Sequence, residues 1–193
     1  MVRELLLRGF QIKILIRNPE NFQNIHSSIE IIQGDARDYS SVLSVTENCT
    51  AVISTLGQSK GEPPIFSDAS SNIIRAMNQR NINRYIVLTG LSIDIPMDRK
   101  DLKTSQASAY MRQLFPAIIA DKQKEYEILS ASTVNWTLVR VPLIEQTDQK
   151  RHLSVDMEDC PGDKISATDL ANFLIDQLSD QQYIRMAPFV ANV

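Results

Sequence analysis

Apolar runs and amphipathic segments alternate along nearly the whole chain. Short apolar runs, several with polar residues at alternate positions, predict strands at residues 11–16, 29–32, 51–56, 84–89, 136–141 and 183–187. Apolar residues at helical spacing predict helices at residues 2–8, 40–45, 67–79, 122–131 and 168–178. Gly9 suits the end of the first helix, and Ser166 suits the start of the last one. The segment 92–115 is polar and predicts no regular element.

This alternation of strands and helices indicates the fold class. The predicted strands are apolar enough to be covered on both faces, which is typical of a doubly wound parallel α/β sheet. A length of 193 residues suits one domain of this kind, and no repeat or linker divides it. We therefore expect residues 1–193 to form a single Rossmann-like domain.

Composition and charge narrow the classes of partner. Hydrophobic residues make up 43% of the chain and charged residues 22%, which are the values of an ordinary globular protein. The 20 Lys and Arg residues are balanced by 23 Asp and Glu residues, and neither sign forms a long run. This balance argues against a nucleic-acid partner and against an anionic membrane. No feature of the sequence indicates an oligomeric state.

Targeting and metal-binding signals are also lacking in the sequence. No apolar run approaches the ~20 residues of a membrane span, and the first ten residues do not form a signal peptide. A cytoplasmic location is therefore expected. The two cysteines and two histidines match no metal-ligand spacing, so no metal site is predicted.

Candidate binding residues follow the predicted strands, because ligands of an open parallel sheet lie beyond the carboxyl ends of its strands. These positions hold Arg17, Asp35, Ala36, Thr55, Leu56, Gly57, Thr89, Gly90 and Pro142. Arg17 carries the most specific signal, because a guanidinium at the ribose of a dinucleotide favours NADP over NAD. Two alternatives stay open. Arg17 could be a solvated residue at the end of its strand. Asp35 could cap the next helix, and its position alone favours this role.

Ser92 and Tyr126 are the candidate catalytic residues. Ser92 lies three residues after the strand at 84–89. Hydride-transfer enzymes of the short-chain dehydrogenase type use a Tyr whose pKa is lowered by a Lys four residues later. Here Lys122 precedes Tyr126, so the order is reversed and the usual pair is lacking. The favoured interpretation of Tyr126 is a half-buried helix residue without a catalytic role. The sequence also lacks the Gly-x-Ser-x-Gly turn that would indicate a hydrolase.

The order of these segments resembles the atypical short-chain dehydrogenase/reductase superfamily. The chain is most similar to its NAD(P)H-binding, NmrA-like group, which includes biliverdin-IXβ (flavin) reductase. The matching stretches cover almost the whole length and lie at residues 3–9, 14–19, 33–38, 51–57, 85–92, 135–142 and 165–171.

The resemblance implies a role for each strand end in binding NADP. Arg17 would meet the 2′-phosphate, and Asp35 and Ala36 would meet the adenine. The middle of the cofactor would lie at Thr55, Leu56 and Gly57. The nicotinamide would lie near Thr89, Gly90 and Pro142. In the flavin reductase type, hydride passes to an acceptor stacked on the nicotinamide, and no conserved protein acid is needed.

The chain departs from this family at its beginning. Members begin with a strand and a glycine-rich turn that binds the pyrophosphate, and the sequence starts at the helix that follows them. The missing strand is the central one, so a gap in the sheet is expected. We interpret the sequence as truncated on this ground.

The leading hypothesis is an NADPH-dependent oxidoreductase that transfers hydride to a small or flavin-like acceptor. The alternative is a non-catalytic, NAD(P)-sensing regulatory protein of the NmrA-like type, favoured by the lack of the Tyr-Lys pair. A sugar-nucleotide epimerase is disfavoured, because such enzymes use that pair and a larger C-terminal region.

Overall fold

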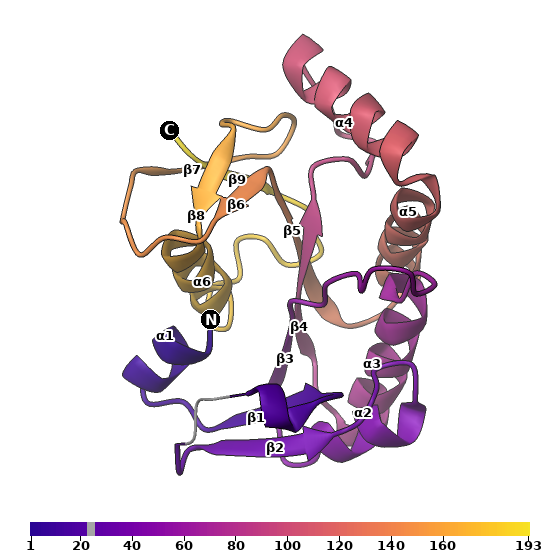
Figure 1. The fold of residues 1–193 in the computed structure, drawn as a ribbon, viewed down its shortest axis with the longest axis vertical. Coiled ribbons are helices and arrows are strands. Elements are labelled where there is room, and N and C mark those ends of the chain that lie inside the picture. Colours follow the sequence, from indigo (N-terminus) through magenta and orange to yellow (C-terminus); the bar gives the residue numbers. More distant parts are fainter. Residues whose placement is uncertain (23–25) are drawn as a thin grey trace.

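Parallel strands with helices on both sides make up residues 1–22 and 26–193, the part of the chain that the computed structural model describes (Figure 1). The strands are β1 (Ile12–Ile16), β2 (Ile29–Gln33), β3 (Ala51–Ser54), β4 (Arg84–Gly90), β5 (Asn135–Val141), β6 (Leu143–Glu145), β7 (Leu153–Asp156), β8 (Lys164–Ser166) and β9 (Phe189–Asn192). The helices are α1 (Val2–Leu7), α2 (Tyr39–Val45), α3 (Phe66–Arg80), α4 (Leu102–Leu114), α5 (Pro116–Ala131) and α6 (Ala167–Asp176), with a short 3₁₀ helix at Pro19–Asn21.

The strands form two sheets. In the larger sheet the order is β3-β4-β5-β9-β8-β6, and β3, β4, β5 and β9 run parallel to one another. β7 and β8 pair antiparallel with β9, and β6 pairs in parallel with β8 at the far edge of the sheet. In the smaller sheet β1 pairs in parallel with β2 alone. The prediction of a parallel, Rossmann-like α/β architecture is confirmed.

A break separates the two sheets between β1 and β3. Within the described residues, β1 hydrogen-bonds to no strand other than β2, and β3 to none other than β4. The expected gap in the sheet is therefore present, and two open strand edges border it. The small sheet is held instead by packing, because Leu15 of β1 contacts the hydrophobic core and α2 packs on α3.

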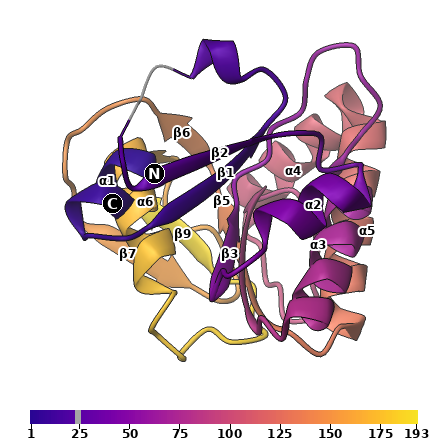
Figure 2. The same ribbon diagram turned by 90° about the horizontal axis from the view of Figure 1, so that it is seen from below.

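Each face of the larger sheet is covered by its own helices (Figures 1 and 2). Successive side chains of a strand point to opposite faces. Tyr85 and Val87 of β4 accordingly join the core beneath α3 and α5, whereas Ile86 joins the core beneath α6. Burial on both faces explains why apolar residues occupy adjacent positions, 85–88 in β4 and 138–139 in β5, and not only alternate ones.

Helix α4 is the main departure from the sequence prediction, which has no regular element over 92–115. The side chain of Asp101 accepts a hydrogen bond of 2.7 Å from the Thr104 backbone N–H and so caps the helix. Only Thr104 and Ser108 of α4 are buried, so the buried stripe consists of small polar residues. An apolar periodicity is therefore absent from the sequence of this helix.

Smaller differences concern the ends of elements. The predicted strand at 183–187 is wrong: Arg185 has a positive φ of 57°, and the last strand is β9. The cap of α2 is Asp38, which accepts from Ser40 and Ser41, so the cap role favoured for Asp35 is also wrong. α5 begins six residues before the predicted start, at Pro116, where proline suits a first helical position.

Two predicted helix ends are confirmed. Gly9 follows α1 with a φ of 76°, a conformation that glycine adopts without strain. Ser166 caps α6 by accepting a 3.0 Å hydrogen bond from Asp169 N–H. Among the described residues, none of the helices has the length and apolar character that crossing a membrane requires.

Candidate functional site

The carboxyl ends of the parallel strands gather the predicted binding residues at one edge of the fold. Arg17 follows β1, Asp35 follows β2, and the loop 55–64 follows β3. Arg17 donates a 2.6 Å hydrogen bond to Ser59 Oγ of that loop. The ends of the two sheets therefore meet at this edge, although no backbone ladder joins them.

Four charged residues, called here the arginine cluster, meet at this edge: Arg17, Asp35, Arg37 and Glu62. Arg17 donates through one nitrogen to both Glu62 oxygens at 2.7 Å. Arg37 lies 3.4 Å from Asp35 and 3.4 Å from Glu62, and it donates a 2.7 Å hydrogen bond to the Pro63 carbonyl. Glu62 raises the pKa of Arg17 above its ordinary value, chiefly by this hydrogen bond. Both guanidiniums thus converge on one carboxylate.

The positions predicted to line the middle of a dinucleotide, and Ala36 predicted at its adenine, differ in exposure. Thr55 and Gly57 are exposed after β3, and Leu56 between them packs against the core. Ala36 is buried, and its carbonyl accepts a 3.0 Å hydrogen bond from Asn72. Thr55 and Gly57 are therefore open to a ligand, whereas Ala36 chiefly anchors the end of β2 to α3.

Thr89 and Gly90 end β4 beside Pro142, which follows β5. The backbone N–H of Leu91 donates to the Val141 carbonyl at 3.1 Å, so the two strand ends stay in register. Thr89 is 2% exposed. Gly90 and Pro142 are partly exposed at the same edge. These three predicted residues are brought together.

Lys122 of α5 is a residue that the sequence analysis did not select. Its ammonium lies 3.4 Å from Thr89 Oγ1 and 4.2 Å from the centre of the Phe66 ring. Burial lowers the pKa of Lys122, and the charges of Glu125 and Asp121 partly oppose this. The signal in the sequence is a pair of charged residues, Lys122 and Glu125, on the helix face that also carries Ile119 and Leu129.

Tyr126, in contrast, does not reach this edge. Its ring packs edge-on against Trp136, with 6.2 Å between the ring centres. Trp136 is the second residue of β5 and pairs with Tyr85 near the start of β4, at the other end of the strands. Tyr126 therefore packs in the core, one helical turn after Lys122 and away from the strand ends.

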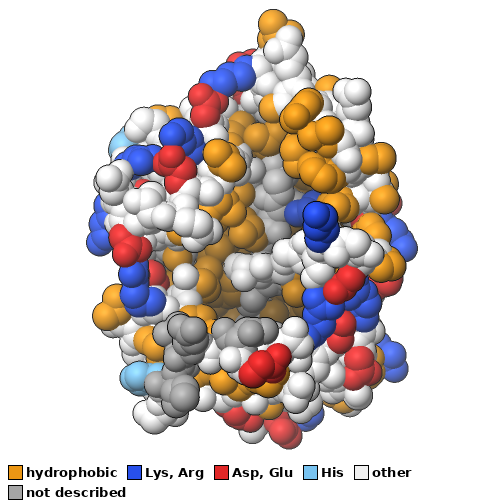
Figure 3. Space-filling view, viewed as in Figure 1, with side chains coloured by type: hydrophobic (Ala, Val, Ile, Leu, Met, Phe, Trp, Pro, Cys, Tyr) orange, Lys and Arg blue, Asp and Glu red, His pale blue; other side chains and the backbone are white. Residues whose placement is uncertain are grey.

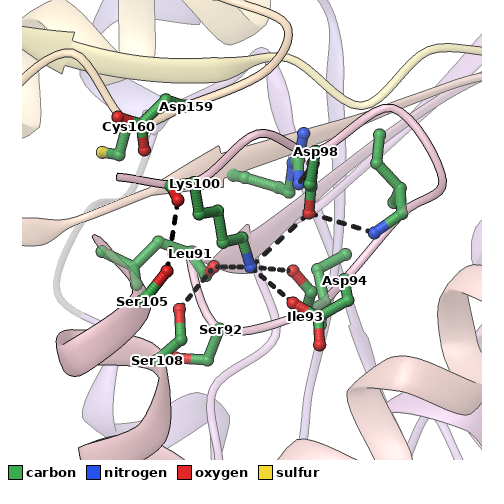
Figure 4. A network of polar contacts seen from close by, with 12 residues as sticks. Leu91, Ser92, Ile93, Asp94, Asp98, Lys100, Ser105, Ser108, Asp159 and Cys160 are labelled. Atoms are coloured by element: carbon green, nitrogen blue, oxygen red, sulfur yellow. Dashed lines mark hydrogen bonds and ion pairs between the residues drawn. The ribbon is translucent and has the colours of Figure 1, made fainter. Parts of the chain in front are cut away.

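The loop after β4 is held by a buried lysine, Lys100 (Figure 4). Its ammonium donates to the carbonyls of Leu91 at 3.0 Å and Ile93 at 2.6 Å, and to Asp94 at 2.8 Å. Its side chain is 7% exposed. Ser92, a predicted catalytic residue in this loop, is itself buried, and its carbonyl accepts a 2.9 Å hydrogen bond from Arg112. The loop backbone is thus fixed at several points.

Asp98 links this loop to the centre of the sheet. One oxygen accepts a 2.6 Å hydrogen bond from Arg140 of β5, and the other lies 3.5 Å from Lys100. Arg140 is fully buried, donates to the Ala187 carbonyl at 2.8 Å and lies 3.5 Å above the Phe189 ring. Burial lowers the pKa of Arg140, and Asp98 opposes that shift. Asp98 therefore neutralises two buried cations at once.

Hydrophobic side chains line a hollow in the centre of this face, above the two-stranded sheet (Figure 3). The described part of the chain brings together no group of three or more His, Cys, Asp or Glu residues suited to a metal ion. The edge offers guanidinium, ammonium, hydroxyl and backbone groups, together with the carboxylates of Asp35 and Glu62. The donor groups among them suit a phosphorylated organic ligand.

The family of the chain is identified by its sequence. The sequence model of a family described as NAD(P)H-binding matches residues 1–181. The chain belongs to this NAD(P)H-binding family. The expected NAD(P)H-binding family is thereby confirmed, and its description names a nicotinamide cofactor as the ligand. None of the curated proteins compared with the chain matches it in sequence.

Solved structures of low sequence identity share the fold of this family member. One is an anaerobillin reductase from Escherichia coli O157:H7, with a TM-score of 0.81, 15% identity, and coverage of 99% of this chain and 89% of that one. A second is a short-chain dehydrogenase/reductase from Veillonella parvula in complex with NADP, with a TM-score of 0.78, 15% identity, and coverage of 98% and 87%. A third, a Rossmann-fold NAD(P)-binding family protein from Shigella flexneri, has a TM-score of 0.74, 16% identity, and coverage of 99% and 85%.

Proposed function

We propose that the chain is an NADPH-dependent oxidoreductase that passes hydride to a small or flavin-like acceptor. The observation that carries this proposal is the pair of guanidiniums, Arg17 and Arg37, at the strand ends of an NAD(P)H-binding fold. A 2′-phosphate is the part of NADP that NAD lacks, and arginine forks suit phosphate oxygens. An NADP-bound structure among the fold relatives supports the same choice of cofactor.

The residues at the other end of the edge fit the proposed cofactor as well. The nicotinamide, when bound, would supply the hydride. Gly90 leaves room, because a Cβ added there meets no atom within 4 Å. The Lys122 ammonium beside Thr89 can donate hydrogen bonds to ligand hydroxyls. Because the pKa of Lys122 is lowered, it can also release a proton to the acceptor that receives the hydride.

The cofactor proposal is tested by Arg17→Met. Losing the charge-assisted hydrogen bond to the phosphate should weaken NADPH binding by about ten- to a hundredfold and leave NADH binding nearly unchanged. Titrations followed by nicotinamide fluorescence measure both affinities. Lys13→Met is the matched control, since Lys13 lies in β1, the strand that ends directly before Arg17, and pairs with Glu30 instead. Equal losses for NADPH and NADH would remove the phosphate role of Arg17.

A second test concerns the role of Lys122. We expect Lys122→Met to lower kcat for flavin or quinone reduction by about a hundredfold, because the proton donor at the edge is lost. Lys124→Met, on the same helix but exposed, should leave kcat unchanged. Stopped-flow oxidation of NADPH at saturating cofactor separates this effect from weaker binding. Equal rates for the two variants would exclude Lys122 from the chemistry.

A non-catalytic, NAD(P)-sensing role is the second candidate function. It is favoured by position 118, four residues before Lys122, where an apolar Ile packs against the core instead of a tyrosine. Such a protein would bind the cofactor without turnover. NADPH binding together with an oxidation rate equal to that of buffer, for flavins and quinones alike, would decide for this role.

A further inference from the structure

The arginine cluster already contains a partner for its guanidiniums. Arg17 and Arg37 contribute two positive charges, and Asp35 and Glu62 contribute two negative charges, so the formal charges cancel. Both arginines approach both carboxylates, but Arg17 lies closer to Glu62, at 2.7 Å, than to Asp35, at 4.0 Å. A carboxylate is planar and carries one charge, whereas a phosphate monoester offers three oxygens and nearly two charges. The Glu62 carboxylate and a bound phosphate would therefore compete for the guanidinium donors of Arg17 and Arg37.

The backbone around Glu62 is built to place this carboxylate. The Gln58 side-chain amide donates to the carbonyls of Ser59 at 3.0 Å and Glu62 at 2.9 Å, which fixes the turn. Gly61, directly before Glu62, has a φ of 81°, a conformation that side chains rarely adopt. The position of Glu62 thus follows from the folded loop and not from a chance surface contact.

Asp35 and Glu62 differ in how they are held. Asp35 accepts a 2.8 Å hydrogen bond from the Arg37 backbone N–H, which anchors it at the end of β2. Among residues 1–22 and 26–193, the hydrogen bonds of the Glu62 side chain run to the two arginines alone. When a phosphate arrives, Glu62 is the group whose side chain can turn to solvent without breaking another hydrogen bond.

We propose that Glu62 sets the preference between phosphorylated and unphosphorylated cofactor. It holds Arg17 and Arg37 together in the free protein, and a 2′-phosphate must displace it from both. This inference rests on the proposed function and refines its specificity. It also assigns Arg37, two residues beyond Asp35, as a second ligand of the phosphate.

The test is the binding of two nucleotides that differ by the phosphate concerned. Adenosine 2′,5′-bisphosphate and adenosine 5′-monophosphate are titrated by calorimetry into the wild-type protein, Glu62→Gln and Arg37→Met. Glu62→Gln should bind the bisphosphate about tenfold more tightly, because the competing charge is gone, and the monophosphate unchanged. Arg37→Met should weaken the bisphosphate alone. Glu30→Gln is the matched control, since it removes a carboxylate from the same small sheet.

The outcomes separate this inference from the function beneath it. If Glu62→Gln binds the bisphosphate no more tightly than the wild type, Glu62 is not a competitor and the inference fails, while cofactor binding itself stands. If neither nucleotide binds the wild type or Glu62→Gln, the proposed function falls together with the inference. Thermal unfolding of each variant ensures that the titrations compare folded proteins.

Discussion

Asp98→Asn is expected to destabilise the protein by about 3 kcal/mol. The substitution keeps the shape of the side chain and removes the charge that faces Arg140 and Lys100. Both cations are nearly inaccessible to water, with 0% and 7% of their side chains exposed. A buried charge without its counter-ion costs several kcal/mol. Among the described residues, Arg140 has Asp98 as its carboxylate partner, whereas Lys100 keeps a second one in Asp94 at 2.8 Å. Urea unfolding at neutral pH measures the loss of free energy.

Asp163→Asn provides the control for this experiment. Asp163 pairs with Lys103, and the two side chains are 62% and 69% exposed. Exposed ion pairs contribute about 1 kcal/mol or less, so this variant should unfold nearly as the wild type does. If Asp98→Asn were no less stable than Asp163→Asn, the buried network could not be what holds the loop after β4.

Glu125 should make the stability of the protein depend on pH. Its side chain is buried between α3, α5 and β4, and one oxygen accepts a 2.6 Å hydrogen bond from Ser70. The other oxygen has no hydrogen-bond partner among the described residues. Burial raises the pKa of Glu125 from 4.5 to about 7, although the Ser70 hydroxyl and the Lys122 charge oppose the shift. The folded state therefore holds the proton of Glu125 more tightly than the unfolded chain does.

The direction of the effect follows from that difference in pKa. The contribution of Glu125 to stability is complete below pH 4.5 and is lost as the pH rises from 4.5 to about 7. Glu125→Gln keeps a neutral side chain at every pH. Between pH 5 and pH 8, the free energy of unfolding of the wild type should therefore fall by about 2 to 3 kcal/mol relative to this variant. Urea unfolding at both pH values measures the difference.

Glu127→Gln, on the exposed side of the same helix, should follow the wild type across this range. Parallel pH profiles for the wild type and Glu125→Gln would mean that the carboxyl is ionised in the folded protein. In that case the charge of Lys122 would outweigh the effect of burial.

The sequence predicts the central strands of the sheet better than it predicts the helices and loops around them. β4 and β5 carry adjacent apolar residues because both of their faces are buried, and this signal is readable in the sequence. α4 leaves no such signal, because the stripe that it buries consists of Thr104 and Ser108. The cap of α2 is also ambiguous in the sequence, because Asp35 and Asp38 both precede this helix. The structure shows that Asp38 is the capping residue.

The candidate site shows the same division between local and long-range information. Strand ends can be located in the sequence, so Arg17, Thr89 and Pro142 were predictable as residues of the edge. Glu62 and Lys122 reach that edge from a loop and a helix, and their partners lie 45 and 33 residues away. Such contacts depend on how elements pack, which periodicity does not encode. Arg37 could have been found by extending the strand-end rule by one residue beyond Ala36.

The break between β1 and β3 bears on how a long ligand would bind. In a continuous sheet, backbone hydrogen bonds set the spacing of neighbouring strands at roughly 4.8 Å. Here the spacing between Arg17 and Thr89 depends on side chains instead, among them Leu15 in the core and the contact of Arg17 with Glu62. A molecule that touches Arg17 and Thr89 together would span the break. It would act as a tether between the two sheets, so part of its binding free energy would go into fixing their separation.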